Sequence, residues 1–248
     1  MDNKPKGTTL PDHLFTSLLL APILLGQAIY TRKVTPRLPE PAGPRAGCVG
    51  SGPSVKLLIL GDSAAAGVGV TCQSEALSGA LSAKLSTRYR LEWRLLAETG
   101  LGAAELIDKL NRGPAFSTDF VLISIGVNDI TRGLSAKRWI SKLTQLQHQL
   151  INKYKAKTIL FTSVPPMGRF PALPQPLRWY LGRKADLFNR HLKTFAQAQP
   201  NLEFIGVDFP ITLSFIAEDG FHPSRTAYDL WSDLVVERIS DISGHHCS

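Results

Sequence analysis

The chain has 248 residues, of which 44% are hydrophobic and 19% are charged, and its formal net charge is +8. These proportions are ordinary for a globular protein and allow a sizeable core. The basic residues are scattered, without a run of roughly five or six, so the sequence gives little support to nucleic-acid binding. Three widely spaced cysteines, Cys48, Cys72 and Cys247, form no CxxC pair, which argues against a disulfide framework or a zinc site and predicts free thiols.

An apolar segment, residues 14–30, lies near the start of the chain. Its interruptions are small or polar residues: Thr16, Ser17, Pro22, Gly26 and Gln27. As a helix the segment would reach roughly 25 Å, just short of a bilayer core of about 30 Å. The basic residues Arg32, Lys33 and Arg37 follow it.

Three interpretations of this segment are open. It is a short membrane anchor, and the basic cluster behind it then favours the cytoplasmic side for the rest of the chain. It is a secretory signal, with Gly26 and Ala28 as small residues before a cut, and the mature protein is then exported to the periplasm or secreted. Alternatively, it is a helix packed on the domain. We expect the first of these, membrane association through residues 14–30.

The stretch from 36 to 53 contains five prolines and is typical of a linker. This composition predicts a division of the chain. An N-terminal part, residues 1–52, would hold the apolar segment and the linker, and a catalytic domain would occupy residues 53–248.

From residue 55 onward, short β-rich runs alternate with helical patterns. The predicted strands are residues 55–60, 91–97, 120–125, 158–161 and 202–207. The predicted helices are residues 74–89, 103–110, 135–154, 176–198 and 223–242. Strands buried on both faces and separated by helices indicate an α/β fold, in which a mostly parallel five-stranded sheet has helices on both sides.

Polar residues and glycines gather where the predicted strands end. The segments are Gly61-Asp62-Ser63, Glu98-Thr99-Gly100, Gly126-Val127-Asn128-Asp129 and, after the fifth strand, Asp219-Gly220-Phe221-His222. Ligands of an open parallel sheet bind outside the carboxyl ends of its strands. We therefore expect these four segments to converge on one rim.

The residue types in these segments are those that acyl transfer requires. The hydroxyl of Ser63 is a weak nucleophile unless a base accepts its proton. Of the six histidines, only His222 combines a loop position with a carboxylate three residues earlier, Asp219, which can orient the ring. The side-chain amide of Asn128 and the backbone N–H of Gly100 can donate hydrogen bonds to an oxyanion.

These four blocks, in this order, resemble those of the SGNH (GDSL-like) hydrolases, and the resemblance covers the chain from residue 55 to its final helix. It implies a three-layer, flavodoxin-like α/β/α sandwich and a serine esterase or lipase that needs no metal or cofactor. Ser63 would be the nucleophile, Asp219 and His222 would complete a triad, and the N–H groups of Ser63 and Gly100 with the Asn128 side chain would form the oxyanion hole. The block around Gly100 departs from the family's commoner forms, and Gly102 is an alternative there.

The implied reaction is cleavage of a carboxylic ester through an acyl-enzyme on Ser63. The substrate would be a small acyl ester, a lysophospholipid or a thioester, and no nucleic acid is involved. Two alternatives are an acyltransferase that uses the same triad and a membrane-tethered binding module. The presence of all four polar residues, Ser63, Asn128, Asp219 and His222, argues against the binding module.

Three further features lie beside the predicted site residues or between the predicted elements. We interpret Asp62 and Asp129, which adjoin the predicted site residues, as hydrogen-bonding braces of their loops. The proline-rich stretch 165–183 is either an ordinary surface connection or a wall of the substrate pocket.

Overall fold

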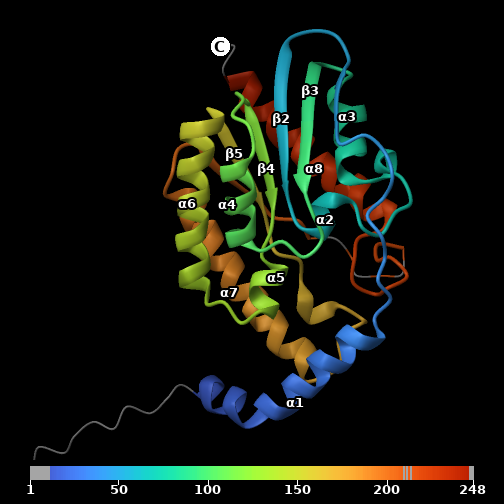
Figure 1. Cartoon of the computed structure of the whole chain (residues 1–248), viewed down its shortest axis with the longest axis vertical. Helices are drawn as coiled ribbons and strands as arrows, with labels where there is room; N and C mark the ends of the chain where they lie inside the picture. The colour runs from blue at the N-terminus through green and yellow to red at the C-terminus, as the bar shows by residue number, and fades with distance from the viewer. Residues whose placement is uncertain (1–11, 209, 211, 213, 246–248) are drawn as a thin grey trace, which may run out of the picture.

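The computed structural model describes residues 12–208, 210, 212 and 214–245, and its centre is a six-stranded sheet in the order β1-β3-β2-β4-β5-β6 (Figure 1). The strands are β1 (Ala46–Val49), β2 (Ser54–Gly61), β3 (Arg90–Ala97), β4 (Phe120–Ser124), β5 (Thr158–Thr162) and β6 (Leu202–Ile205). Strand β1 pairs with β3 in antiparallel fashion, and every other neighbouring pair is parallel.

Helices cover both faces of this sheet. The α-helices of the described residues are α1 (Asp12–Val34), α2 (Ser63–Ala66), α3 (Leu77–Leu85), α4 (Ala103–Arg112), α5 (Val127–Thr131), α6 (Ala136–Tyr154), α7 (Leu177–Gln197) and α8 (Arg225–His245). The described residues also contain two short 3₁₀ helices, Gln73–Glu75 and Met167–Arg169. Helices α4, α6 and α7 lie on one side of the sheet, and α3 and α8 lie on the other (Figure 1).

The two faces follow from the alternation of side chains along apolar strands. In β2, Leu58 and Leu60 join the core beneath α4, α6 and α7, whereas Leu57 and Ile59 join the core beneath α3 and α8. All five residues of β4 are buried, as expected of a central strand covered on both faces. The sequence-based prediction of an α/β sandwich with a mostly parallel sheet is confirmed.

The sheet has one strand more than the five that were predicted. Strand β1 comes from the proline-rich stretch that was expected to be a linker, and it adds an antiparallel edge next to β3. Glu40, in the same stretch, accepts hydrogen bonds from the backbone N–H and hydroxyl of Thr99 at 2.7 and 2.9 Å. An edge strand of only four residues, most of them small, is too short to leave a periodic signal in the sequence.

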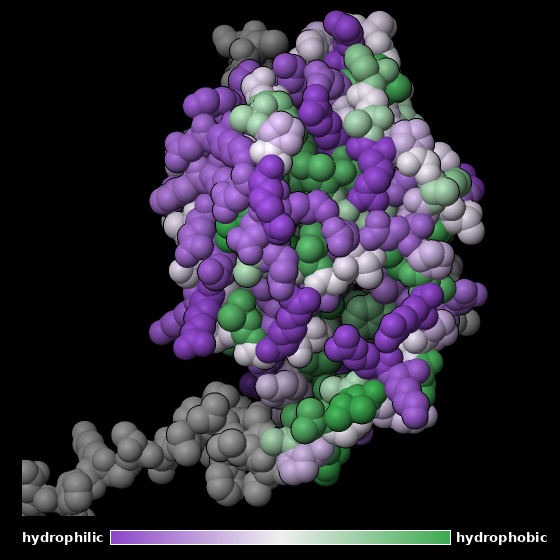
Figure 2. Space-filling view, in the orientation of Figure 1, coloured by the Kyte–Doolittle hydropathy of each residue, from purple (hydrophilic) through white to green (hydrophobic). Residues whose placement is uncertain are grey.

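Helix α1 packs against the start of α7 (Figure 1). Leu24 is buried, and the side chain of Gln27 donates to the carbonyl of Gln175 at 2.6 Å and accepts from the N–H of Leu177 at 3.0 Å. Other apolar side chains of α1 face outward, among them Leu25 with 64% of its surface exposed. Figure 2 shows these hydrophobic residues as green patches at the end of the molecule that α1 forms.

Our prediction of a membrane location is wrong. Within residues 12–208, 210, 212 and 214–245, no helix combines the length and the apolarity needed to cross a bilayer. Pro22, Gly26 and Gln27 lower the mean hydropathy of the apolar segment, and Gln27 forms hydrogen bonds with residues at the start of α7. Membrane association through residues 14–30 is therefore not supported.

Of the three cysteines, Cys48 and Cys72 are free, and Cys247 lies outside the described residues. No group of three or more His, Cys, Asp or Glu side chains in the described part of the chain is arranged to hold a metal ion.

Candidate active site

Ser63 lies at the carboxyl end of the central strand β2, on the first turn of the short helix α2. Asp62 precedes it in extended conformation, and its Oδ1 accepts the N–H of Ala64 at 3.2 Å, which caps the helix. Gly61 has φ +154°, and a Cβ there would lie 2.1 Å from the carbonyl oxygen of Ser124. Only glycine allows the two strands to approach so closely beneath the serine.

His222 connects Ser63 to Asp219 through its two ring nitrogens. Its Nε2 lies 2.9 Å from Ser63 Oγ, and its Nδ1 lies 2.5 Å from Asp219 Oδ2. A proton on Nδ1, shared with the carboxylate, leaves Nε2 free to accept the serine hydroxyl proton. The predicted nucleophile, base and carboxylate are therefore brought together from segments more than 150 residues apart.

Asp219 is held as an anion although it is almost fully buried. Its other oxygen, Oδ1, accepts the N–H groups of Phe221 and His222 at 2.9 and 3.0 Å. Burial by itself raises the pKa of Asp219, but the hydrogen bonds and charge of His222 outweigh it and lower the pKa below its ordinary value. The carboxylate therefore stays ionised and fixes the imidazole ring in place.

Three candidate hydrogen-bond donors follow the carboxyl ends of the neighbouring strands β2, β3 and β4. The backbone N–H groups of Ser63 and Gly100 have no acceptor within the described residues. The side-chain nitrogen of Asn128, from α5 after β4, donates to the carbonyl of Leu101 at 2.9 Å and lies 3.4 Å from Asp62 Oδ2. That second contact is long, so one hydrogen of the amide is only weakly engaged.

The loop that carries Gly100 is fixed at neighbouring backbone groups. Arg132 donates to the carbonyl of Gly100 at 2.7 Å, and Asp129 accepts the N–H of Ala103 at 3.1 and 3.2 Å. Glu105 accepts the N–H of Gly102 at 3.0 Å, so Gly102 has its donor occupied whereas Gly100 does not. This difference favours Gly100 over Gly102 as an oxyanion donor.

Asp62 is the most perturbed carboxyl group near the site. Only 3% of its surface is exposed, and burial raises its pKa from 3.8 to about 7, although the N–H of Ala64 and the charge of His222 act against the rise. Burial also raises the pKa of Asp129. Both side chains accept backbone N–H bonds that hold the loops on which Ser63 and Gly100 lie.

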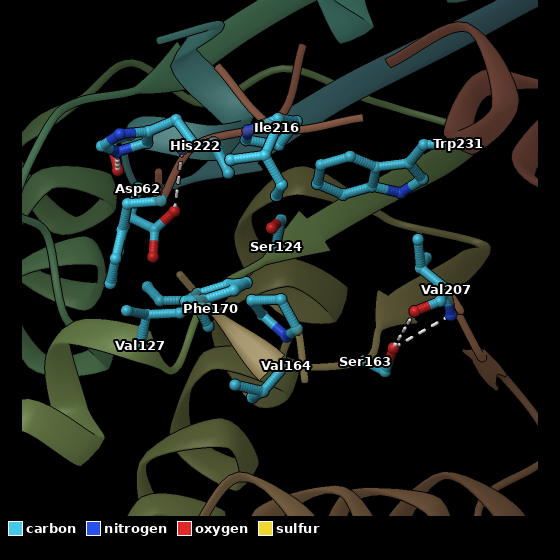
Figure 3. Close-up of a pocket in the computed structure, with 16 residues that line it drawn as sticks. Asp62, Ser124, Val127, Ser163, Val164, Phe170, Val207, Ile216, His222 and Trp231 are labelled. Atoms are coloured by element: carbon cyan, nitrogen blue, oxygen red, sulfur yellow. Dashed lines mark hydrogen bonds between the residues drawn. The ribbon is translucent and has the colours of Figure 1, made fainter. Parts of the chain in front are cut away.

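An apolar cavity opens beside Ser63 and His222 (Figure 3). Phe170 lines it and makes an edge contact with Phe221, with ring centroids 4.9 Å apart. The stretch 165–183 therefore contributes a wall through Pro165 and Phe170, while its remaining residues lie elsewhere, including Trp179 on the exposed side of α7.

Some residues around the site carry no signal in the sequence. Arg132 and Glu105 form an ion pair at 2.7 Å that braces the Gly100 loop, and Glu40 holds the adjacent Thr99. A surface arginine or glutamate looks ordinary until the fold places it next to a backbone carbonyl or N–H. Trp231, which lines the cavity from the last helix, is equally unremarkable in a helical pattern.

Comparison with known proteins agrees with this architecture. The model of the GDSL-like lipase/acylhydrolase family matches residues 59–230. The chain is 28% identical over 255 residues to the GDSL-like esterase Rv1075c of Mycobacterium tuberculosis, and the match covers 88% of this chain and 76% of that protein.

Two solved structures share the fold. The psychrotrophic esterase EstA of Pseudoalteromonas superposes with a TM-score of 0.60 at 20% identity, covering 76% of this chain and 98% of that one. A member of the lipolytic G-D-S-L family from Veillonella parvula superposes with a TM-score of 0.59 at 16% identity, covering 74% and 97%.

Proposed function

Because the chain belongs to the GDSL-like lipase/acylhydrolase family and is thus a hydrolase of ester bonds, we propose that it cleaves carboxylic esters through an acyl-enzyme on Ser63. The observation that carries the proposal is the continuous contact from Ser63 Oγ to His222 Nε2, at 2.9 Å, and from His222 Nδ1 to Asp219, at 2.5 Å. The same arrangement serves acyl transfer on unrelated folds.

In the first half of the reaction, Ser63 Oγ attacks the ester carbonyl carbon while its proton passes to His222 Nε2. The imidazolium that forms is stabilised by the ionised Asp219. The negative oxygen of the tetrahedral intermediate accepts hydrogen bonds from the N–H groups of Ser63 and Gly100 and from the amide of Asn128. When the intermediate collapses, the alcohol oxygen leaves with the proton from His222, and the acyl group remains on Ser63.

In the second half, a water molecule takes the place of the alcohol. His222 accepts a proton from the water as its oxygen attacks the acyl carbon, and the same three donors stabilise the second intermediate. Collapse returns the proton to Ser63 Oγ and releases the carboxylic acid. The enzyme is then back in its starting state, without a net change in protons on the protein.

Purified protein and a panel of nitrophenyl esters test the proposal. We expect measurable turnover of short-chain esters, its loss in Ser63→Ala, and no effect of EDTA. The serine side chain is half-buried and makes its side-chain contact with His222, so the variant should keep the melting temperature of the parent. Full activity in Ser63→Ala would overturn the assignment of the nucleophile.

A further inference from the structure

The residues that line the apolar cavity beside Ser63 include neither Gly100 nor Asn128, the two other residues with oxyanion donors. Gly100 follows β3, which neighbours β2 on one flank, and Asn128 follows β4 on the other. The cavity extends from there over the ends of β5 and β6, where Ser163 and Val207 line it. A carbonyl group on Ser63 that directs its oxygen to Gly100 and Asn128 thereby has the cavity available for one of its substituents.

That substituent is the acyl chain rather than the alcohol. During turnover the alcohol must leave and water must reach the acyl-enzyme, so the leaving group needs a path to solvent. The acyl chain stays attached to Ser63 between the two steps, and a closed cavity serves it well. This assignment rests on the proposed function, because it needs an acyl-enzyme on Ser63.

The cavity is short. Its volume is about 50 Å³, and a water-sized group occupies roughly 10–15 Å³ of such space. A cavity of this size holds the tail of a short acyl chain but not that of a long one. Its walls are mostly apolar, with Ile216, Phe170 and Phe221 near the histidine.

Trp231 closes the end of the cavity that is farthest from His222. Figure 3 shows His222 at one end, Ile216 between, and Trp231 with Val207 at the other end. Trp231 is 4% exposed, and its indole stacks on Tyr228 with ring centroids 6.2 Å apart and an interplanar angle of 13°. Tyr228 is itself fixed, because its hydroxyl donates to the carbonyl of Val68 at 2.7 Å.

A wall held in this way does not move aside at low cost, because packed interiors resist the insertion of extra methylene groups. We infer that Trp231 sets the acyl-chain length of this esterase, and that its substrates are esters of short, unbranched fatty acids. Longer chains meet the indole ring before their carbonyl carbon reaches Ser63 Oγ.

The experiment measures kcat/KM for nitrophenyl acetate, butanoate, hexanoate and octanoate. We expect kcat/KM of the parent enzyme to be at least about 10-fold higher for butanoate than for octanoate. One methylene group beyond what an apolar pocket can hold lowers kcat/KM by roughly 10-fold. Trp231→Leu should raise the octanoate-to-butanoate ratio by about 10-fold or more. The matched control is Trp179→Leu on α7, an exposed tryptophan away from the cavity, which should leave the ratio unchanged.

A second variant works in the opposite direction and keeps the test valid if Trp231→Leu does not fold. Val164→Leu adds one methylene group to the cavity wall and should lower kcat/KM for butanoate more than for acetate. A flat chain-length profile in the parent, or a ratio unmoved in both variants, would overturn the inference. Turnover that survives in Ser63→Ala would instead refute the proposed function, so the two failures are distinguishable.

Discussion

Two regions of the molecule reverse the usual placement of side chains. At the rim of the sheet, Asp62, Asp129 and Asp219 are each at most 5% exposed, although buried carboxyl groups are costly. On α1, by contrast, Leu25 and Ile29 are 64% and 61% exposed. The rim keeps polar groups inside, and α1 keeps apolar groups outside.

The buried carboxyl groups of the rim and the exposed apolar side chains of α1 differ in the contacts they make. Every buried carboxyl group of the rim accepts hydrogen bonds that hold a loop or a ring of the site. The exposed face of α1 makes no such contribution, and the helix is attached through Leu24 and Gln27. We therefore expect substitutions at the rim to change chemistry and those on α1 to change stability alone.

The largest effect is expected at His222. His222→Ala removes the acceptor for the proton of Ser63 Oγ and should lower kcat by about 10⁴-fold or more. The matched control is His148→Ala on α6, an exposed histidine distant from the rim, which should leave kcat within about two-fold of the parent. Steady-state kinetics on one ester compares them, and similar losses in both variants would contradict the separation of the two regions.

A cost in stability is expected for the buried carboxyl group of Asp62. Because its pKa is about 7 when folded and near 3.8 when unfolded, the folded state keeps a proton between these values that the unfolded state has released. Its contribution to stability is full below about pH 4 and is lost as pH rises to about 7.

The variant Asp62→Asn has no such proton. The difference in unfolding free energy between the variant and the parent should therefore increase in favour of the variant, by up to about 4 kcal/mol, as pH rises across this window. Urea unfolding at several pH values measures the gap, with the exposed Asp108→Asn as control. A gap that is constant with pH would refute the burial of an ionisable Asp62.

At Asn128 we expect an effect on the transition state. Asn128→Ala should lower kcat by about 10²–10³-fold with little change in KM, because the amide is needed mainly when charge develops on the oxygen. Thr131→Ala, on the exposed side of the same helix, is the control. A rise in KM with kcat unchanged would make Asn128 a substrate-binding residue instead.

The smallest effect is expected on α1 and concerns stability. Leu24→Ala uncovers a buried leucine and should lower the unfolding free energy by about 2–3 kcal/mol, whereas the neighbouring Leu25→Ala should change it by less than about 0.5 kcal/mol. Neither variant should alter kcat/KM. Equal behaviour of the two leucines in urea unfolding would contradict the packing of α1 on α7.

The same two regions show what could be predicted from the sequence. Strands such as Phe120–Ser124 are nearly all apolar, so the sheet could be predicted from the sequence pattern. The polar residues at its rim followed from the rule that sites lie at strand ends. The partner of an apolar helix is not encoded in its own hydropathy. Nothing in residues 14–30 indicates that Gln27 bonds to α7. The membrane prediction was wrong because no helix of the described residues is long and apolar enough to cross a bilayer.

The hydrogen bonds that hold the Gly100 loop could not be predicted from the sequence either, because they join segments that are distant along the chain. Arg132 reaches the carbonyl of Gly100 across 32 residues, and Glu40 reaches Thr99 across 59. Helices α2 and α5 are only four and five residues long, too short for a periodic pattern, although both carry residues of the proposed site.

The central claim is that Ser63 becomes acylated, and covalent labelling tests it most directly. A fluorophosphonate transfers its phosphoryl group to an activated serine oxygen with loss of fluoride, and intact-mass and peptide mass spectrometry locate the adduct. We predict one adduct per chain on the peptide that contains Ser63, strongly slowed labelling in His222→Ala, and none in Ser63→Ala. An adduct on another residue, or an unlabelled enzyme that still hydrolyses esters in the presence of the reagent, would contradict the account.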